Sequence, residues 1–229
     1  MKIVISNCIV RIVCASILSV ASQYAVAQSA PSPGEVSSYE GLHKAAHLGQ
    51  TDAIKKLIAA EADIEARDAS GRTPLIIAAF ASHDEAVKIL AESGADLNAL
   101  EHRDYDIVTI AAVANDVELL DLALDLGASA GNVTSPYEGT ALIAAAHLGH
   151  HEVVKRLIES DAPLDHINNL HWTALIEAVV LGDGGADHIE TARLLVEAGA
   201  DQSITDSDGV TAKQLAKQRG YEAMLKMFN

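Results

Sequence analysis

The sequence contains few aromatic residues and few basic residues. Aromatic residues make up 3% of the 229 residues, and 16 Lys and Arg face 32 Asp and Glu, for a formal net charge of −16. Because aromatic and β-branched residues dominate strands, the scarcity of aromatics disfavours a β-sandwich or a β-barrel. The shortage of basic residues argues against binding to nucleic acid or to anionic membranes, which requires clustered Lys and Arg.

The first residues have the features of a secretory signal. Lys2 and Arg11 supply positive charge, residues 12–20 form an apolar run, and Ala25-Val26-Ala27 provides an A-x-A cleavage site. The run is too short for a bilayer, which needs about 20 apolar residues. The sequence therefore predicts a signal peptide over residues 1–27 and a periplasmic or secreted protein.

Cysteine is absent from the rest of the chain, since Cys8 and Cys14 both lie in the predicted signal. A mature chain without cysteine has no disulfide, no thiolate metal site and no cysteine nucleophile. The segment 28–38 is rich in Ser, Pro and Gly and is predicted to be a flexible tether. No later segment is apolar for long enough to predict a membrane span.

A motif recurs along the remaining sequence at intervals of 33 or 34 residues over most of its length. Its fullest copy runs from Gly71 to Ala79, and related copies include Asp106, Thr140 and Thr173. Each copy is followed by a Leu-rich stretch and then by Gly-Ala-Asp or a variant of it. This pattern predicts a short Ala-rich helix, a turn, a Leu-rich helix and an extended loop in each unit. No single unit can bury its own apolar stripe, so neighbouring units must stack.

The pattern resembles the ankyrin repeat. The family's G-x-T-P-L-x-x-A-A motif is matched by Gly71 to Ala79, and its G-A-D-x-N turn by Gly94 to Asn98. The resemblance implies an all-α solenoid of stacked helix-turn-helix units with hairpin-like loops, and a non-enzymatic protein that binds a protein partner. It covers residues 39–229, with five full repeats and a C-terminal cap at 39–70, 71–103, 104–137, 138–170, 171–208 and 209–229.

Some copies depart from the motif. Gly94, Gly127 and Gly199 follow the second helix, where a left-handed residue is expected, but Glu61 and Asp161 occupy the same place. A positive φ at each of these two residues should cost about 1 kcal/mol. The third repeat starts with Asp104-Tyr105-Asp106 instead of Gly-x-Thr, so we expect its loop to be irregular.

The sequence shows no motif of a known catalytic or cofactor site. It contains no G-x-S-x-G, no P-loop and no H-E-x-x-H, and we predict no cofactor and no metal. Its densest group of candidate ligands is His147, His150 and His151, together with His188. An alternative hypothesis is therefore a metal-binding or enzymatic accessory protein, or a pH-sensitive binder. A secreted effector directed at a host is a further alternative.

The resemblance also implies which residues face a partner. Ankyrin proteins generally bind through the tips of the loops and the concave face of the first helices, where four of the seven aromatic residues after position 27 fall. The predicted partner-binding residues are Arg72, Phe80, His102, Arg103, Tyr105, Tyr137, His147, Leu170, Trp172 and Leu181. The alternative for Tyr105 and Trp172 is packing against neighbouring loops. We expect a monomer whose acidic charge favours partners with basic patches.

Overall fold

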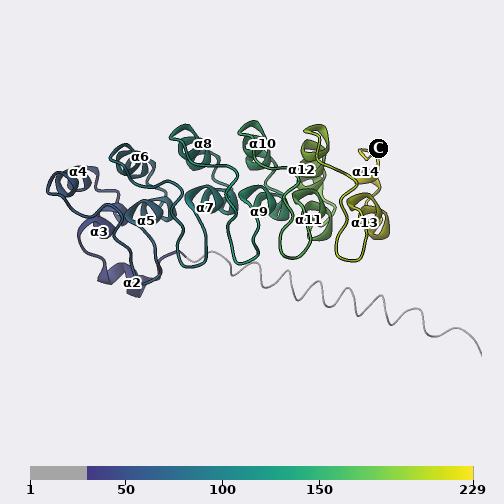
Figure 1. Cartoon of the computed structure of the whole chain (residues 1–229). Helices are drawn as coiled ribbons and strands as arrows, with labels where there is room; N and C mark the ends of the chain where they lie inside the picture. The colour runs from purple at the N-terminus through teal and green to yellow at the C-terminus, as the bar shows by residue number, and fades with distance from the viewer. Residues whose placement is uncertain (1–29, 229) are drawn as a thin grey trace, which may run out of the picture.

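The computed structural model describes residues 30–228, which form two rows of short helices with loops projecting along one side (Figure 1). The first row consists of α3 (Gly41–His47), α5 (Pro74–Phe80), α7 (Ile107–Ala114), α9 (Ala141–Leu148), α11 (Ala174–Val180) and α13 (Ala212–Arg219). The second row consists of α4 (Thr51–Ala59), α6 (Asp84–Glu92), α8 (Val117–Asp125), α10 (His151–Glu159), α12 (Ala186–Glu197) and α14 (Glu222–Leu225). One further helix, α2 (Pro33–Ser38), precedes both rows.

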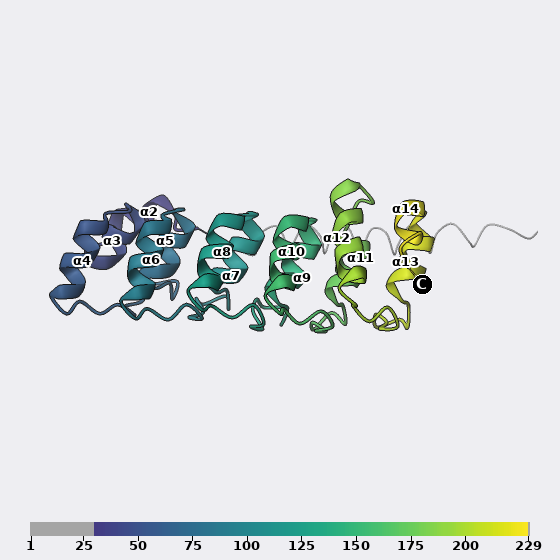
Figure 2. The same cartoon turned by 90° about the horizontal axis from the view of Figure 1, so that it is seen from above.

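The predicted all-α solenoid is confirmed. Within residues 30–228 there is no β-strand, and only two isolated bridges join Thr134 to Gly139 and Thr205 to Thr211. Successive helix pairs stack side by side from α3/α4 to α13/α14, as the view from above shows (Figure 2). The predicted signal peptide, residues 1–27, lies outside the described residues.

A capping side chain starts each first-row helix from α5 onwards. Thr73 Oγ1 accepts a hydrogen bond from the Ile76 N–H at 3.3 Å, and Pro74 occupies the first helical position, where its missing N–H costs nothing. Asp106 takes the threonine's place before α7. Its Oδ1 accepts the Thr109 N–H at 2.8 Å. The remaining caps are Thr140, Thr173 and Thr211.

Small residues allow the first-row helices to approach one another. One buried alanine recurs at the same position of these helices: Ala45, Ala78, Ala111, Ala145, Ala178 and Ala216. Larger side chains from the second row fill the space between the layers, among them Ile54, Leu90, Leu120, Leu157 and Leu195. The buried residues form one cluster from the first repeat to the last, so each repeat depends on its neighbours for burial.

Left-handed residues end the second-row helices as predicted. Gly94, Gly127 and Gly199 have φ angles of 99°, 102° and 96°. Glu61 and Asp161 occupy the equivalent places with φ angles of 60° each. The positive φ expected at these two non-glycine residues is therefore confirmed.

The loop of the third repeat is regular, so the expectation of an irregular one is wrong. Asp104 adopts a φ of 62°, the left-handed conformation that glycine adopts at the equivalent position of the motif. Glu101 Oε1 accepts the N–H groups of Arg103 and Tyr105 at 2.9 and 3.3 Å. Asp68 forms the same pair of bonds one repeat earlier. Different residues thus provide the same conformation and the same acceptor.

The flexible tether predicted over residues 28–38 is wrong for its second half. Pro33–Ser38 form α2, which lies beneath α3 on the side of the loops (Figure 1). Ser32 and Glu35 form a reciprocal capping box, and Pro33 occupies the first helical position. These are local signals for the start of a helix. The prediction weighed the Ser, Pro and Gly content and overlooked their order.

Candidate functional site

The ends of the first-row helices and the tips of the loops form what we call the inner surface. Most of the predicted partner-binding residues reach solvent there at least in part. They are Phe80, His102, Arg103, Tyr137, His147, Leu170, Trp172 and Leu181. Two others, Arg72 and Tyr105, are buried.

Arg72 is a structural residue in this conformation, which corrects its assignment to an exposed binding surface. It is 2% exposed, and its Nε donates to Asp68 Oδ2 at 2.8 Å while its Nη2 contacts Glu35 Oε1. Burial alone would raise the pKa of Asp68, but hydrogen bonds from Tyr39 and Arg72 outweigh it and lower that pKa. The guanidinium therefore joins the loop after α4 to α2.

Tyr105 is also a structural residue, as the alternative interpretation held. It is 3% exposed and belongs to the main core cluster, and burial raises the pKa of its hydroxyl to about 12. Its assignment to the partner-binding surface is therefore wrong. Trp172 differs, because its ring packs against the core but remains partly exposed.

An apolar row crosses the inner surface at the ends of five consecutive first-row helices. It consists of Leu48, Ala81, Ala114, Leu148 and Leu181, which are spaced by 33 or 34 residues. Leu48 is 48% exposed and Leu148 40%, whereas every other leucine of residues 30–228 is buried or partly buried. The predicted site contained Leu181 and omitted Leu48. The 33-residue spacing back from Ala81 is the signal that could have found it.

The first-row helices that carry this row are almost free of charge. α5, α7 and α9 contain no Asp, Glu, Lys or Arg, and α11 contains only Glu177. The second row carries charges on every helix, and α8 alone contributes Glu118, Asp121 and Asp125. The net negative charge of the chain is thus concentrated away from the helical part of the inner surface.

Glu177 is a buried carboxyl group beside that surface. It is 1% exposed, its Oε1 accepts a hydrogen bond from Asn168 Nδ2 at 3.0 Å, and its Oε2 lies 3.3 Å from His147 Nδ1. Burial raises the pKa of Glu177. Sequence reasoning missed this residue. The available signal was an acid where the aligned helices have Ile77 and Ile110.

The histidines do not form the shared site that the alternative hypothesis required. His150 Nδ1 bonds the Ala112 carbonyl at 2.9 Å, and His188 Nε2 bonds the His147 carbonyl at 3.1 Å. Each imidazole thus connects the start of a second-row helix to the end of a first-row helix in the preceding repeat. His83 makes the same kind of contact with His47.

These contacts give the histidines a structural role between repeats. His151 makes a different contact, with Nδ1 3.6 Å from Asp187 Oδ1. Within residues 30–228, no group of three or more His, Cys, Asp or Glu is placed to hold a metal ion. The hypothesis of a metal site at His147, His150, His151 and His188 therefore lacks the necessary geometry.

Known proteins share both the repeat pattern and the stacked fold. A family model described as ankyrin repeats, in three copies, matches residues 17–101 and 108–206. The chain belongs to the ankyrin repeat family. It is 32% identical over 184 residues to the ankyrin repeat protein YahD of Escherichia coli (strain K12), covering 80% of this chain and 91% of that protein.

Solved ankyrin structures agree with the fold. The crystal structure of an ankyrin repeat domain from Acinetobacter baumannii AYE has a TM-score of 0.77 and 38% identity, covering 81% of this chain and 94% of that one. The ankyrin repeat protein EF0377 has a TM-score of 0.76 and 35% identity, covering 83% and 98%. Ankyrin repeat proteins generally mediate protein–protein interaction and are generally not enzymes. In the part of this chain that the structure describes, every helix is too short or too polar to cross a membrane.

Proposed function

We propose that this ankyrin repeat protein is a non-enzymatic module that binds a protein partner through its inner surface. The observation that carries the proposal is the apolar row. Its Leu48 and Leu148 are exposed, so they are not buried in the contacts that stack the repeats. Exposed apolar side chains that line up across a surface are typical of an interaction site. Because stacked helices hold the row rigid, binding would lose little conformational entropy.

Residues beside the row supply anchors of the kind that dominate binding energy. Phe80, Tyr137 and Trp172 are partly exposed aromatic residues, and the exposed Arg103 lies on a loop between them in sequence. Aromatic residues and arginine are enriched at the energetic centres of protein interfaces. We infer that a partner contacts the apolar row through apolar side chains, since α5, α7 and α9 offer it no charge.

Site-directed crosslinking in cells would test this proposal. A photoreactive amino acid replaces Leu148 on the apolar row or, as a matched control, Glu92 on the exposed face of the second row. We expect a discrete partner to be captured from position 148 and not from position 92. Its capture should fall when Ala114→Asp places a charge in the row of a folded chain. Equal capture from both positions, or none from either, would contradict the proposed site.

We also propose that the chain is exported as a monomer after cleavage behind Ala27. The support is the charged start, the apolar run and the A-x-A sequence of residues 1–27. The full-length chain should yield a product that begins at Gln28 in the periplasmic or secreted fraction, and light scattering should give the mass of one chain. A protein that stays uncleaved in the cell interior would overturn this part of the proposal. Recovery outside the cell would favour a secreted effector.

A further inference from the structure

The loop between α4 and α5 binds a carboxylate that comes from outside its own repeat. Glu35 Oε1, on α2, contacts Arg72 Nη2 and accepts a hydrogen bond from Ser70 Oγ at 2.9 Å. Both of these donors belong to the loop. We call this pair of donors, Arg72 Nη2 and Ser70 Oγ, the Arg72 cradle.

The Arg72 cradle is positioned by groups other than its occupant. Asp68 Oδ1 accepts the N–H groups of Ser70 and Arg72 at 2.8 and 2.9 Å. Asp68 Oδ2 accepts from Arg72 Nε at 2.8 Å and from the Tyr39 hydroxyl at 2.7 Å. Since none of these bonds involves Glu35, the cradle is preorganised for a carboxylate.

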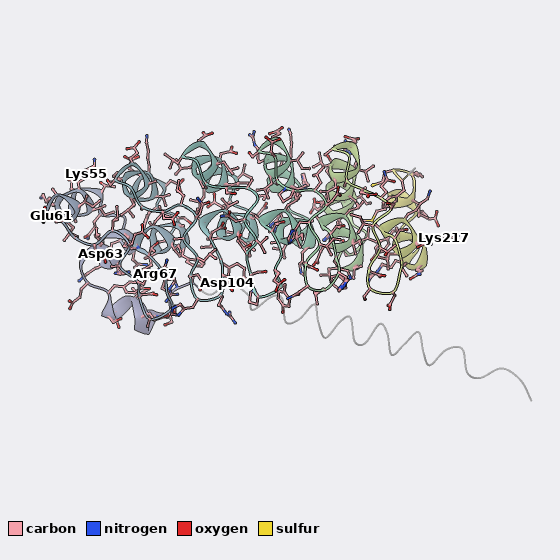
Figure 3. The ribbon with its side chains drawn as sticks, in the orientation of Figure 1. Lys55, Glu61, Asp63, Arg67, Asp104 and Lys217 are labelled. Carbon is pink, nitrogen blue, oxygen red and sulfur yellow. The ribbon has the colours of Figure 1, made fainter. Side chains whose placement is uncertain are left out.

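The occupant is attached less firmly than the cradle. α2 has six residues, none of them buried, and Glu35 is 31% exposed. A cavity of about 260 Å³ lies beside it, lined by Glu35 and Ser38 on one side and by Arg67 and Asp68 on the other. Figure 3 labels Arg67 beside α2. Val36 is the one α2 side chain that packs against the core, and a helix this short is marginal without tertiary packing, so few contacts hold α2 in the cradle.

Later loops contact their neighbours in a different way. The His102 N–H donates to the Ser70 carbonyl at 3.0 Å, and the Asn169 N–H donates to the Tyr137 carbonyl at 3.0 Å. The Asn169 side chain adds a hydrogen bond from its Nδ2 to the Pro136 carbonyl at 3.1 Å. In each of these contacts the acceptor is a backbone carbonyl, whereas α2 supplies the Glu35 carboxylate. In the next loop, the position equivalent to Arg72 is occupied by Tyr105, so that loop has no guanidinium group there.

We propose that the Arg72 cradle is an acceptor for a carboxylate on an acidic segment of a protein partner, and that α2 fills it in cis as a competitor. The inference rests on the proposed binding function, but it concerns a second contact at the N-terminal end of the row of loops. Glu35 is the carboxylate that shows which chemistry the cradle takes. An acidic side chain on a short helical turn is the partner that fits.

A peptide added in trans would test this acceptor. Glu35→Ala in the chain 28–229 empties the cradle, and Ser37→Ala on the same helix is the matched control. The probe is a synthetic peptide with the sequence of residues 30–39, and its twin carries Gln in place of Glu. Binding is followed by the NMR shifts of the Ser70 and Arg72 amides in an isotope-labelled chain.

We expect the acidic peptide to bind the Glu35→Ala chain about tenfold more tightly than its Gln twin does. It should bind the Ser37→Ala and unchanged chains at least about tenfold more weakly, because tethered α2 has a high effective concentration. Ser70→Ala in the Glu35→Ala background should weaken binding several-fold. Equal binding of the two peptides, or no shift with a folded chain at millimolar peptide, would overturn the proposal.

The outcome is separable from that of the apolar row. Crosslinking from position 148 tests the row without involving α2, and the peptide titration tests the cradle without needing the unidentified partner. If the peptide binds while position 148 captures nothing, the cradle stands and the proposed inner-surface function fails. The reverse result leaves the inner surface in place and removes the acceptor.

Discussion

The two rows of helices carry charge very differently, although they alternate along one chain. The first-row helices α5, α7 and α9 contain no Asp, Glu, Lys or Arg, whereas α8 in the second row carries three acids and no base. The first row is enclosed by loops and by neighbouring repeats, and ionised side chains are costly there. The second row faces solvent, where acidic residues favour solubility.

This comparison changes how the net charge of the chain bears on binding. A charge of −16 suggests partners with basic patches, but most of the acids on the helices belong to the second row. The helical part of the inner surface offers apolar contact instead. The affinity of a partner that bound the second row would fall with rising salt concentration, because salt screens interactions between exposed charges. A partner on the apolar row should bind with little dependence on salt.

The largest expected effect contrasts a buried and an exposed residue of the predicted site. Tyr105→Ala should lower the free energy of unfolding by about 3 kcal/mol or more, because it leaves a cavity in the core. Leu148→Ala, on the exposed apolar row, should change it by less than about 0.5 kcal/mol. Chemical denaturation of both variants provides the measurement. Similar losses would mean that the apolar row is part of the core.

A second contrast compares an acid beneath the first row with one on the second row. Asp106→Ala should destabilise by about 1–2 kcal/mol, because Asp106 caps α7. Its Oδ2 also accepts a hydrogen bond from Asn132 Nδ2 at 2.9 Å. Asp121→Ala, on α8, removes a surface contact to Arg156 and should cost less than about 0.5 kcal/mol. A denaturation midpoint for Asp106→Ala equal to that of Asp121→Ala would contradict the role of this cap.

Glu177 is the one acid in the first row between α5 and α11, and it sharpens the comparison through pH. Because burial raises its pKa in the folded state, the folded state holds its proton more firmly than the unfolded state does. The contribution of Glu177 to the free energy of unfolding is therefore fully present below about pH 4.5, which is the ordinary pKa of a glutamate. This contribution declines as pH rises through the raised pKa of the folded state.

Glu177→Gln keeps the shape and the hydrogen-bonding capacity but cannot ionise. We expect its unfolding free energy to match that of the unchanged chain near pH 4 and to exceed it increasingly toward pH 8. Each unit of upward shift in the pKa corresponds to about 1.4 kcal/mol. Glu92→Gln, at an exposed place on α6, should show no such trend. If Glu177→Gln is less stable at pH 8 than the unchanged chain, the contacts of the ionised carboxylate with Asn168 and His147 are worth more than the cost of burying its charge.

Much of the fold could be predicted because local signals for a helix start recur at a fixed spacing. Thr73 and Pro74 mark a helix start, and the 33-residue period then places every equivalent helix. The period could not show that the loop of the third repeat has the same conformation as the loop before it. Asp104 supplies the positive φ that glycine usually supplies, and Glu101 supplies the carboxylate that accepts the backbone N–H groups. Equivalence in backbone geometry does not require identity in sequence.

The candidate site was less predictable, because a register position does not determine burial. Arg72 and Tyr105 occupy positions that the family presents to partners, but Glu35 and the core enclose them here. Glu35, the partner of Arg72 from outside the loop, lies 37 residues away in a segment that was predicted to be flexible. Glu177 and Leu48 were missed for the opposite reason. Their positions in the repeat were known, but their residue types were not compared with those at the equivalent positions of the other repeats.

The smallest expected effect concerns the ends of the second-row helices, where two repeats differ from the other three. Glu61 and Asp161 hold φ angles of 60° that glycine adopts without a steric cost, and Glu61 lies at the end of α4 (Figure 3). Glu61→Gly should relieve that cost but should also give the unfolded chain more freedom, so the expected net gain is about 0.5 kcal/mol. Gly94→Ala provides the matched reverse change, since Gly94 has a φ of 99° with no neighbouring atom in the way of a Cβ. It should destabilise by about 1 kcal/mol through backbone strain alone. Denaturation midpoints that moved the same way in both variants would show that φ does not decide the residue at this position.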